Sequence, residues 1–410
     1  MVLNYIWVSF FLVAFIIGLV RLIFFGDVGI FPSLFNSTMD MAKLGFEISL
    51  GLTGAMTLWL GIMKIGENGG IVAIFYRLTG PLLKRLFPEI PENHKLFGPL
   101  IMNISANMLG LDNAATPMGI KAMEGMQELN KNKDKASNAQ IMFLVLNTSG
   151  LTILPINVMV IRAQMGAVDP SDIFIPTLLA TFFSTLAGLI VVSIYQKINL
   201  LNRTILLYIG SLTALIIVFI LYLNTLPQEK IATISSVASN LTLFSVIILF
   251  IVLALIKKVN VYESFIEGAK EGFSIAIKII PFLVAMLVAI GVFRTCGALD
   301  YLVDGVRYLV SAFGMNTDFV DSLPTAFVRP LSGSGSRGMM VETMSSFGVD
   351  SFAGRLSSVM QGTTETTLYV VAVYFGAIGV RNTRYAITCG LIADFAGIVA
   401  AIFLSYLFFH

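Results

Sequence analysis

Long apolar runs, interrupted at a few polar points, dominate the pattern of this chain. About nine of these runs are of a length that crosses a hydrocarbon core of roughly 30 Å as a helix. They are residues 5–25, 48–63, 141–161, 175–195, 205–223, 241–256, 275–293, 357–378 and 385–409. The pattern therefore predicts an all-α polytopic membrane protein with about nine spans.

The segment 71–87 is apolar but carries Arg77, Lys84 and Arg85. We interpret it as a helix lying at the membrane interface rather than as a further crossing. With the N-terminus in the cytoplasm, this choice puts the basic clusters at 131–135 and 257–258 on the cytoplasmic side, as the positive-inside rule requires. The sequence thus predicts a multi-pass protein with a cytoplasmic N-terminus and an external C-terminus.

Composition agrees with this class, because 57% of the residues are hydrophobic and only 12% are charged, against roughly 25% charged in soluble proteins. Cys296 and Cys389 are the two cysteines and His94 and His410 the two histidines. This inventory disfavours a disulfide framework, a zinc site and His-based catalysis. We expect no enzyme, no cofactor, no metal centre and no nucleic-acid partner; the lipid bilayer is the expected surrounding.

The two halves of the chain echo each other. Residues 41–46 match 268–273, residues 137–150 match 351–364, and Ala187-Gly188 corresponds to Ala396-Gly397. We therefore predict one repeat in residues 1–200 and a second in 236–410, joined by a linker span in 201–235. Because each copy crosses an even number of times, the linker span starts the second copy from the opposite face, which makes the repeats inverted. That architecture is typical of secondary transporters, although duplications also occur in channels and membrane scaffolds.

Four polar stretches interrupt the apolar pattern, at 103–117 and 147–150 in the first copy and at 329–338 and 361–367 in the second. Backbone groups left unpaired in hydrocarbon cost several kcal/mol, so such stretches must be buried in protein or line a wet cavity. The first of each pair predicts a re-entrant hairpin, with a helix starting at Thr116-Pro117 in the first copy. The second of each pair predicts a helix broken at its centre. We expect the four stretches to line one cavity.

Amide, hydroxyl and carbonyl oxygens are hard donors that suit Na⁺ or the polar groups of a solute, and ionisable residues within a membrane are functional candidates by default. The predicted solute- or ion-binding residues are Asn103, Asn107, Asp112, Asn113, Asn147, Thr148, Ser149, Arg329, Ser332, Ser334, Arg337, Gln361, Thr363, Thr364 and Glu365. For Glu365 and Arg337, a structural salt bridge competes with roles as a coupling site and an anion clamp. Asp112 also fits a local cap, and Asp394 fits either a buried hydrogen bond between helices or a contact with the solute.

These motifs resemble a known family. Residues 103–124 resemble the signature of spore maturation protein A, whereas 329–340, 361–367 and 380–385 resemble spore maturation protein B. The two resemblances cover nearly the whole chain, which is similar to a natural fusion of both. Both belong to the nucleoside-recognition, or Gate, group of membrane domains, which is similar to the gate of ferrous-iron transport protein B and, more distantly, to concentrative nucleoside transporters. The resemblance implies a protein of the bacterial cytoplasmic (inner) membrane that moves a small solute.

The sequence as a whole predicts a secondary active transporter of a small polar solute, such as a nucleoside, an amino acid or a related anion. Alternating access at the repeat interface would move the solute, with coupling to Na⁺ or H⁺. Two alternatives stay open: a membrane scaffold or regulator of envelope or spore maturation without transport, and a channel or flippase. The small-residue faces at Gly188 and Gly397 permit close helix contact, and similar folds form homo-oligomers.

Overall fold

A computed structural model describes residues 2–91, 94–109 and 112–410 of the chain. This part of the chain is helical, with one isolated β-bridge between Lys135 and Asn382. The helices are α1 (Val2–Phe25), α2 (Ile30–Gly69), α3 (Ile71–Leu86), α4 (Phe97–Met108), α5 (Asp112–Leu129), α6 (Asn138–Thr148), α7 (Ile156–Gln164), α8 (Phe174–Gln196), α9 (Arg203–Ile205), the π-helix η1 (Leu206–Gly210), α10 (Ser211–Leu223), α11 (Gln228–Ile256), α12 (Val261–Thr295), α13 (Ala298–Ala312), the 3₁₀ helix η2 (Val320–Ser322), α14 (Leu323–Val328), α15 (Gly333–Phe347), α16 (Phe352–Thr363), α17 (Thr367–Ala377) and α18 (Ala386–Phe409).

The chain forms two compact units, and each unit takes segments from both halves of the sequence. Unit 1 comprises residues 1–60, 157–170 and 269–361, and unit 2 comprises 61–156, 171–268 and 362–410. Helices α2 and α12 each begin in one unit and end in the other. The boundaries 1–200 and 236–410 describe sequence copies and remain a prediction.

The predicted spans are recovered in part. Among the described residues, six helices are long and apolar enough to cross a membrane: α1, α2, α8, α11, α18 and the stretch Arg203–Leu223. A seventh span results if Ile280–Thr295 and Ala298–Ala312, which meet at a 70° bend, count as one. The two other predicted spans, 141–161 and 357–378, are interrupted helices, so length and composition support six or seven spans rather than nine.

Helices α2 and α12 are much longer than the apolar runs 48–63 and 275–293 suggested, with 40 and 35 residues. The preceding segments 41–46 and 268–273 are rich in good helix formers, so the helix continues through them. Within unit 1, glycines bring the two backbones together. A Cβ on Gly45 would lie 3.1 Å from Val284 Cα, and a Cβ on Gly272 would lie 2.8 Å from Thr57 Cα.

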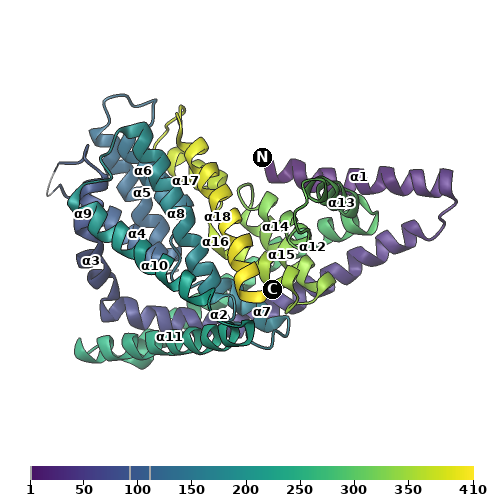
Figure 1. Cartoon of the computed structure of the whole chain (residues 1–410), viewed down its shortest axis with the longest axis horizontal. Coiled ribbons are helices and arrows are strands. Elements are labelled where there is room, and N and C mark those ends of the chain that lie inside the picture. The colour runs from purple at the N-terminus through teal and green to yellow at the C-terminus, as the bar shows by residue number, and fades with distance from the viewer. Residues whose placement is uncertain (1, 92–93, 110–111) are drawn as a thin grey trace. The chain divides into compact units, whose positions relative to one another are not determined.

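In unit 2, α8 and α18 lie side by side (Figure 1). Their contact depends on small residues, because a Cβ on Gly188 would lie 3.1 Å from Ala393 Cβ and one on Gly397 would lie 3.0 Å from Ser184 Cβ. The Ser184 hydroxyl donates to Ala393 O at 2.9 Å. The close helix contact predicted from Gly188 and Gly397 is confirmed within the chain.

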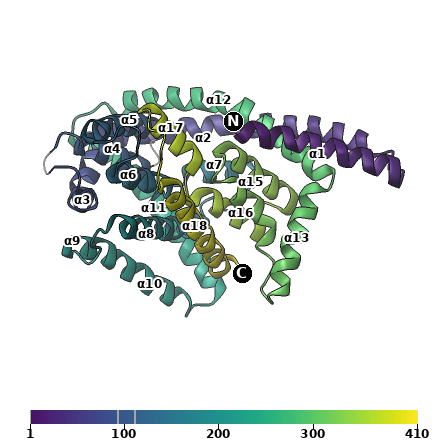
Figure 2. The same ribbon diagram turned by 90° about the horizontal axis from the view of Figure 1, so that it is seen from above.

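Two helical hairpins occur where the sequence predicts hairpins. Helices α4 and α5 pack together in unit 2, where α6 and α17 also contact α5 (Figure 2), and α14 packs on α15 in unit 1. The predicted helix start at Thr116-Pro117 is wrong, because α5 begins at Asp112 and Pro117 lies inside it. Asp112 to Ala115 form the first turn of α5, where most N–H groups need no helical partner. An acidic residue such as Asp112 is favourable in this turn, and the helix starts before the proline.

Candidate functional site

Both predicted helix breaks are present. Helix α6 ends at Thr148 and α17 begins only at Thr367, after α16 has ended at Thr363. The last carbonyls of a helix lack helical partners, and here Thr148 O accepts a hydrogen bond of 2.8 Å from the backbone nitrogen of Glu365. A Cβ on Gly150 would lie 3.4 Å from Glu365 Cγ. The breaks from the two sequence halves therefore meet directly within unit 2.

Beside these breaks, four polar side chains form the asparagine–tyrosine cluster: Asn103 and Asn107 of α4, Asn147 of α6 and Tyr374 of α17. Asn107 Nδ2 donates to Asn147 Oδ1 at 2.5 Å, and the Tyr374 hydroxyl donates to the same oxygen at 3.3 Å. Asn103 Nδ2 donates to the Tyr374 hydroxyl at 3.1 Å. The cluster brings together three predicted site residues from two polar stretches.

Tyr374 was missed by the sequence reasoning, because it lies in an apolar stretch that was interpreted as part of a span. A buried tyrosine hydroxyl normally finds a hydrogen-bond partner, and Tyr374 is only 5% exposed. A tyrosine within a predicted span was the available signal. It could not show which polar residues the hydroxyl meets.

Two buried oxygens near the breaks have unused bonding capacity. Asn103 Oδ1 and Ser149 Oγ are fully buried and have no hydrogen-bond partner among the described residues. Leaving a buried acceptor or hydroxyl unsatisfied costs about 1–3 kcal/mol. Polar atoms held in this state are suited to contact a bound solute or ion.

The second break is lined by hydroxyls. Thr363 and Thr364 are buried, whereas Glu365 is exposed. The Thr367 hydroxyl donates to Asp394 Oδ2 of α18 at 2.6 Å, and Asp394 is 1% exposed. Asp394 thus makes the buried hydrogen bond between helices that was one of its two predicted roles, and Glu365 is the accessible carboxylate at the break.

The remaining predicted residues belong to unit 1: Arg329, Ser332, Ser334, Arg337 and Gln361. The Ser332 hydroxyl accepts from Gly335 N at 2.9 Å and caps α15, with the Ser334 hydroxyl 3.3 Å away. Gln361 is 4% exposed, and its Oε1 has no partner in the described residues. The single cavity expected from all four stretches stays a prediction. The side chains of Asp112 and Asn113 lie outside the described part.

Glu342 of α15 is buried and makes an ion pair in unit 1. Arg294 Nε lies 2.6 Å from Glu342 Oε1, and the Ser346 hydroxyl donates to the same oxygen at 2.8 Å. The pair accounts for this buried charge structurally.

Within the described residues, no group of three or more His, Cys, Asp or Glu side chains is placed to hold a metal ion.

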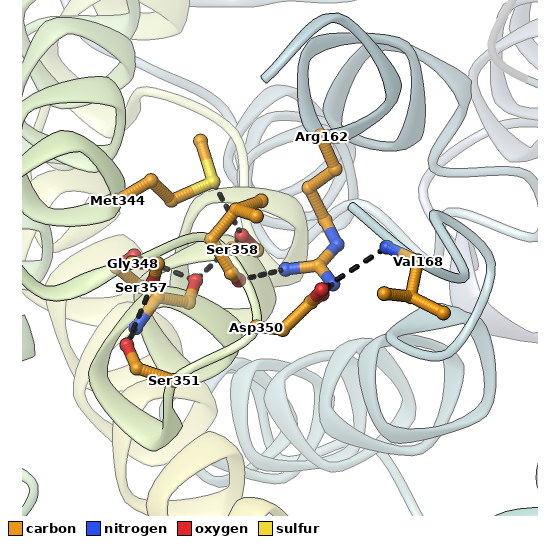
Figure 3. A network of polar contacts seen from close by, with 10 residues as sticks. Arg162, Val168, Met344, Gly348, Asp350, Ser351, Ser357 and Ser358 are labelled. Carbon is orange, nitrogen blue, oxygen red and sulfur yellow. Dashed lines mark hydrogen bonds and ion pairs between the residues drawn. The ribbon is translucent and has the colours of Figure 1, made fainter. Parts of the chain in front are cut away.

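A buried arginine joins the two sequence halves in unit 1 (Figure 3). Arg162 is 0% exposed and donates to Val349 O at 2.9 Å and to Asp350 Oδ1 at 3.2 Å. Asp350 Oδ2 accepts from Val168 N at 3.0 Å, so the carboxylate spans both segments. We call this group, Arg162, Val168, Val349 and Asp350, the Arg162 clamp.

A comparable contact occurs in unit 2. Arg384 Nη1 donates to Ala136 O and to Asn138 Oδ1, both at 3.0 Å, and the Tyr385 hydroxyl donates to the latter at 2.8 Å. Backbone hydrogen bonds from Ala136 N to Asn382 O and from Asn382 N to Asp134 O also join these two segments. In both units, the loop that precedes a broken helix, α6 or α16, is thus fastened by an arginine from the other half of the sequence.

Helical hairpins, two broken helices and several apolar spans define an all-helical polytopic membrane protein. The chain belongs to the Gate family, described as nucleoside recognition, whose model matches residues 49–165 and 276–381, more than half of the chain.

Two curated relatives are similar to different parts of the chain. Spore maturation protein B of Bacillus subtilis (strain 168) is 52% identical over 154 residues, which are 38% of this chain and 85% of that protein. Spore maturation protein A of the same organism is 39% identical over 188 residues, or 46% of this chain and 92% of that protein. No significant match to a solved structure was found.

Proposed function

We propose that this protein is a secondary active transporter of a small polar solute that works by alternating access in the bacterial cytoplasmic membrane. The family description, nucleoside recognition, makes nucleosides the first class to test, before amino acids and related anions. The transporter has no enzymatic activity and no cofactor. It crosses the membrane nine times, with its N-terminus in the cytoplasm and its C-terminus outside, and the broken helices α6–α7 and α16–α17 supply the two crossings that lack a continuous apolar helix.

The observation that carries this proposal is a contact pattern that repeats when the sequence halves are exchanged. Under the match of 41–46 with 268–273, Gly45 corresponds to Gly272 and Thr57 to Val284. Gly45 packs against Val284, and Gly272 packs against Thr57. Two equivalent glycines thus make equivalent contacts along one antiparallel helix pair, which supports a two-fold relation between the repeats.

A second helix pair behaves in the same way in unit 2. Gly188 corresponds to Gly397, and with the same spacing Ser184 corresponds to Ala393. Gly188 packs against Ala393, and Gly397 packs against Ser184. Inverted repeats can exchange conformations, and that exchange exposes a single site to each side of a membrane in turn.

The site that we assign to the solute and the coupling ion lies at the breaks. The uncharged oxygens of Asn103 and Ser149 with free bonding capacity and the exposed carboxylate of Glu365 support it. Carbonyl, hydroxyl and carboxylate oxygens suit Na⁺, and a carboxylate alone suits a proton.

Proteoliposome uptake tests the proposal. The wild-type protein should accumulate radiolabelled uridine, or a member of a nucleoside and amino-acid panel, when an inward Na⁺ or H⁺ gradient is imposed. Glu365→Gln should abolish the gradient dependence, and Asn147→Ala should lower uptake at least tenfold. Asn240→Ala, on an exposed face of α11, is the matched control and should transport normally.

A scaffold or regulator of spore or envelope maturation is the second candidate, favoured by the names of both relatives. Absence of saturable uptake across the panel, by protein that is monodisperse and thermally stable, would overturn the transporter in favour of this role.

A further inference from the structure

An apolar pocket adjoins the first helix break in unit 2. It has a volume of about 220 Å³ and lies between α3, α4, α8 and α10, with Gly150 and Leu151 of the break in its wall. Most of the wall consists of Leu, Ile, Met and Phe side chains, such as Leu83, Leu186 and Leu189. No Asp, Glu, Lys, Arg or His is among the described residues that line it.

Of the described polar side chains in the wall, those of Thr79, Thr185 and Asn107 are already bonded within the protein, whereas Tyr208 is exposed. The Thr79 hydroxyl donates to Phe75 O at 2.8 Å, and the Thr185 hydroxyl donates to Ser149 O at 3.3 Å. Asn107 donates to Asn147 in the asparagine–tyrosine cluster. A polar solute in this pocket would exchange its water hydrogen bonds for few new ones, and an ion would find no charged side chain among the described lining residues. Water is also disfavoured, because a buried water needs two to four polar partners.

The exposed residues of the pocket wall lie on η1 and α10, and we place the opening of the pocket there. Tyr208 of η1 and Leu212 of α10 line it and are 36% and 41% exposed. They lie in the candidate span Arg203–Leu223, of which only 11% is buried within the protein. The π-helical turn Leu206–Gly210 is at this opening, and such turns are frequent at functional sites. In a bilayer, the molecules next to this opening are hydrocarbon chains.

We propose that this pocket binds one hydrocarbon chain of a membrane lipid, inserted past η1 with its tip against Gly150 and Leu151. An unfilled apolar cavity loses the dispersion contacts of its lining atoms, and a hydrocarbon chain restores them without requiring hydrogen bonds. The pocket adjoins the asparagine–tyrosine cluster, with which it shares the wall residue Asn107, but the lipid proposal does not depend on transport. It brings the bilayer into contact with the helix break itself.

Photolabelling tests this assignment in the full-length protein. The protein is reconstituted in phosphatidylcholine nanodiscs that contain a phosphatidylcholine with a diazirine near the end of one acyl chain. After illumination, adducts are mapped by mass spectrometry of peptides. Labelling should concentrate on Gly150, Leu151 and the pocket residues of α3 and α8, and Leu186→Trp, which fills the pocket, should reduce it there at least fivefold. Leu215→Trp on the exposed face of α10 should leave pocket labelling unchanged.

Other results would overturn the lipid assignment. Equal labelling of all lipid-facing helices, with no excess at the pocket, would show that no chain enters. Unchanged labelling in a Leu186→Trp protein that keeps its melting temperature would show that the adducts arise elsewhere; Leu186→Phe serves as a milder filling variant if the tryptophan protein does not fold. Protection of the pocket by millimolar uridine would assign the space to the solute instead.

Discussion

The guanidinium of Arg162 pairs with the carboxylate of Asp350 across 188 residues of sequence, at 3.2 Å. Arg162 is fully buried, and its bond to Val349 O fixes the loop that precedes the broken helix α16. The pair therefore couples the end of the first broken helix, α7, to the start of the second within unit 1. A buried charge of this kind is costly unless its partner stays in place.

Removing the arginine should destabilise the protein more than removing an exposed one. Arg162→Ala leaves Asp350 without its buried partner and should lower the unfolding free energy by about 3 kcal/mol. Arg307→Ala breaks pairs with Asp304 and Asp321 at a side chain that is 38% exposed, and should cost about 1 kcal/mol or less. Thermal unfolding in detergent, followed by circular dichroism, compares the two variants. Equal unfolding midpoints would contradict a stabilising role for the Arg162 clamp.

The asparagine–tyrosine cluster predicts an order of effects. Asn147→Ala removes the acceptor of both Asn107 and Tyr374 and should destabilise by about 2 kcal/mol, because buried donors lose their partners. Tyr374→Phe removes only the hydroxyl and should cost less, about 1 kcal/mol. Asn240→Ala should be neutral in the same melting experiment. If Tyr374→Phe lost more stability than Asn147→Ala, Asn147 Oδ1 would not be the central acceptor of the cluster.

Close packing of α8 on α18 can be tested with a single methyl group. In Gly188→Ala the new Cβ would lie 2.9 Å from Val145 Cγ1 and 3.1 Å from Ala393 Cβ, so overpacking should cost about 1–3 kcal/mol. Gly376→Ala, on α17 with no atom within 4 Å of the new Cβ, should gain about 0.5–1 kcal/mol from helix propensity. Melting points that shift in the same direction would argue against the close contact.

Cysteine accessibility tests the proposed nine-span topology. In a background with the buried Cys296 and Cys389 replaced by alanine, Lys133→Cys should react with a membrane-impermeant maleimide only from the cytoplasmic side. Asp169→Cys, beyond one further crossing, should react only from outside. The maleimide reaches the outer face in intact cells and the cytoplasmic face in inverted vesicles. If both positions reacted in only one of these preparations, α6–α7 would not be a complete crossing.

The positions of the breaks were readable from sequence, because Gly, Asn, Ser and Thr at 147–150 and 361–367 interrupt otherwise apolar helices. The close contacts of Gly188 and Gly397 were readable for a similar reason, since a small residue on an apolar face predicts a close neighbour. The lengths of α2 and α12 were underestimated, because hydropathy marks where a helix meets hydrocarbon and carries no information on where its backbone stops being helical.

The sequence by itself determined the membrane class, the family and the polar residues that interrupt the helices, since these follow from local composition and motif. Only the tertiary structure decided that Tyr374 joins the asparagines, that Thr148 O accepts from Glu365 N and that Arg162 meets Asp350. Each of these contacts joins segments far apart in the chain. Their pairing depends on how whole helices pack, and a local pattern does not encode the partner.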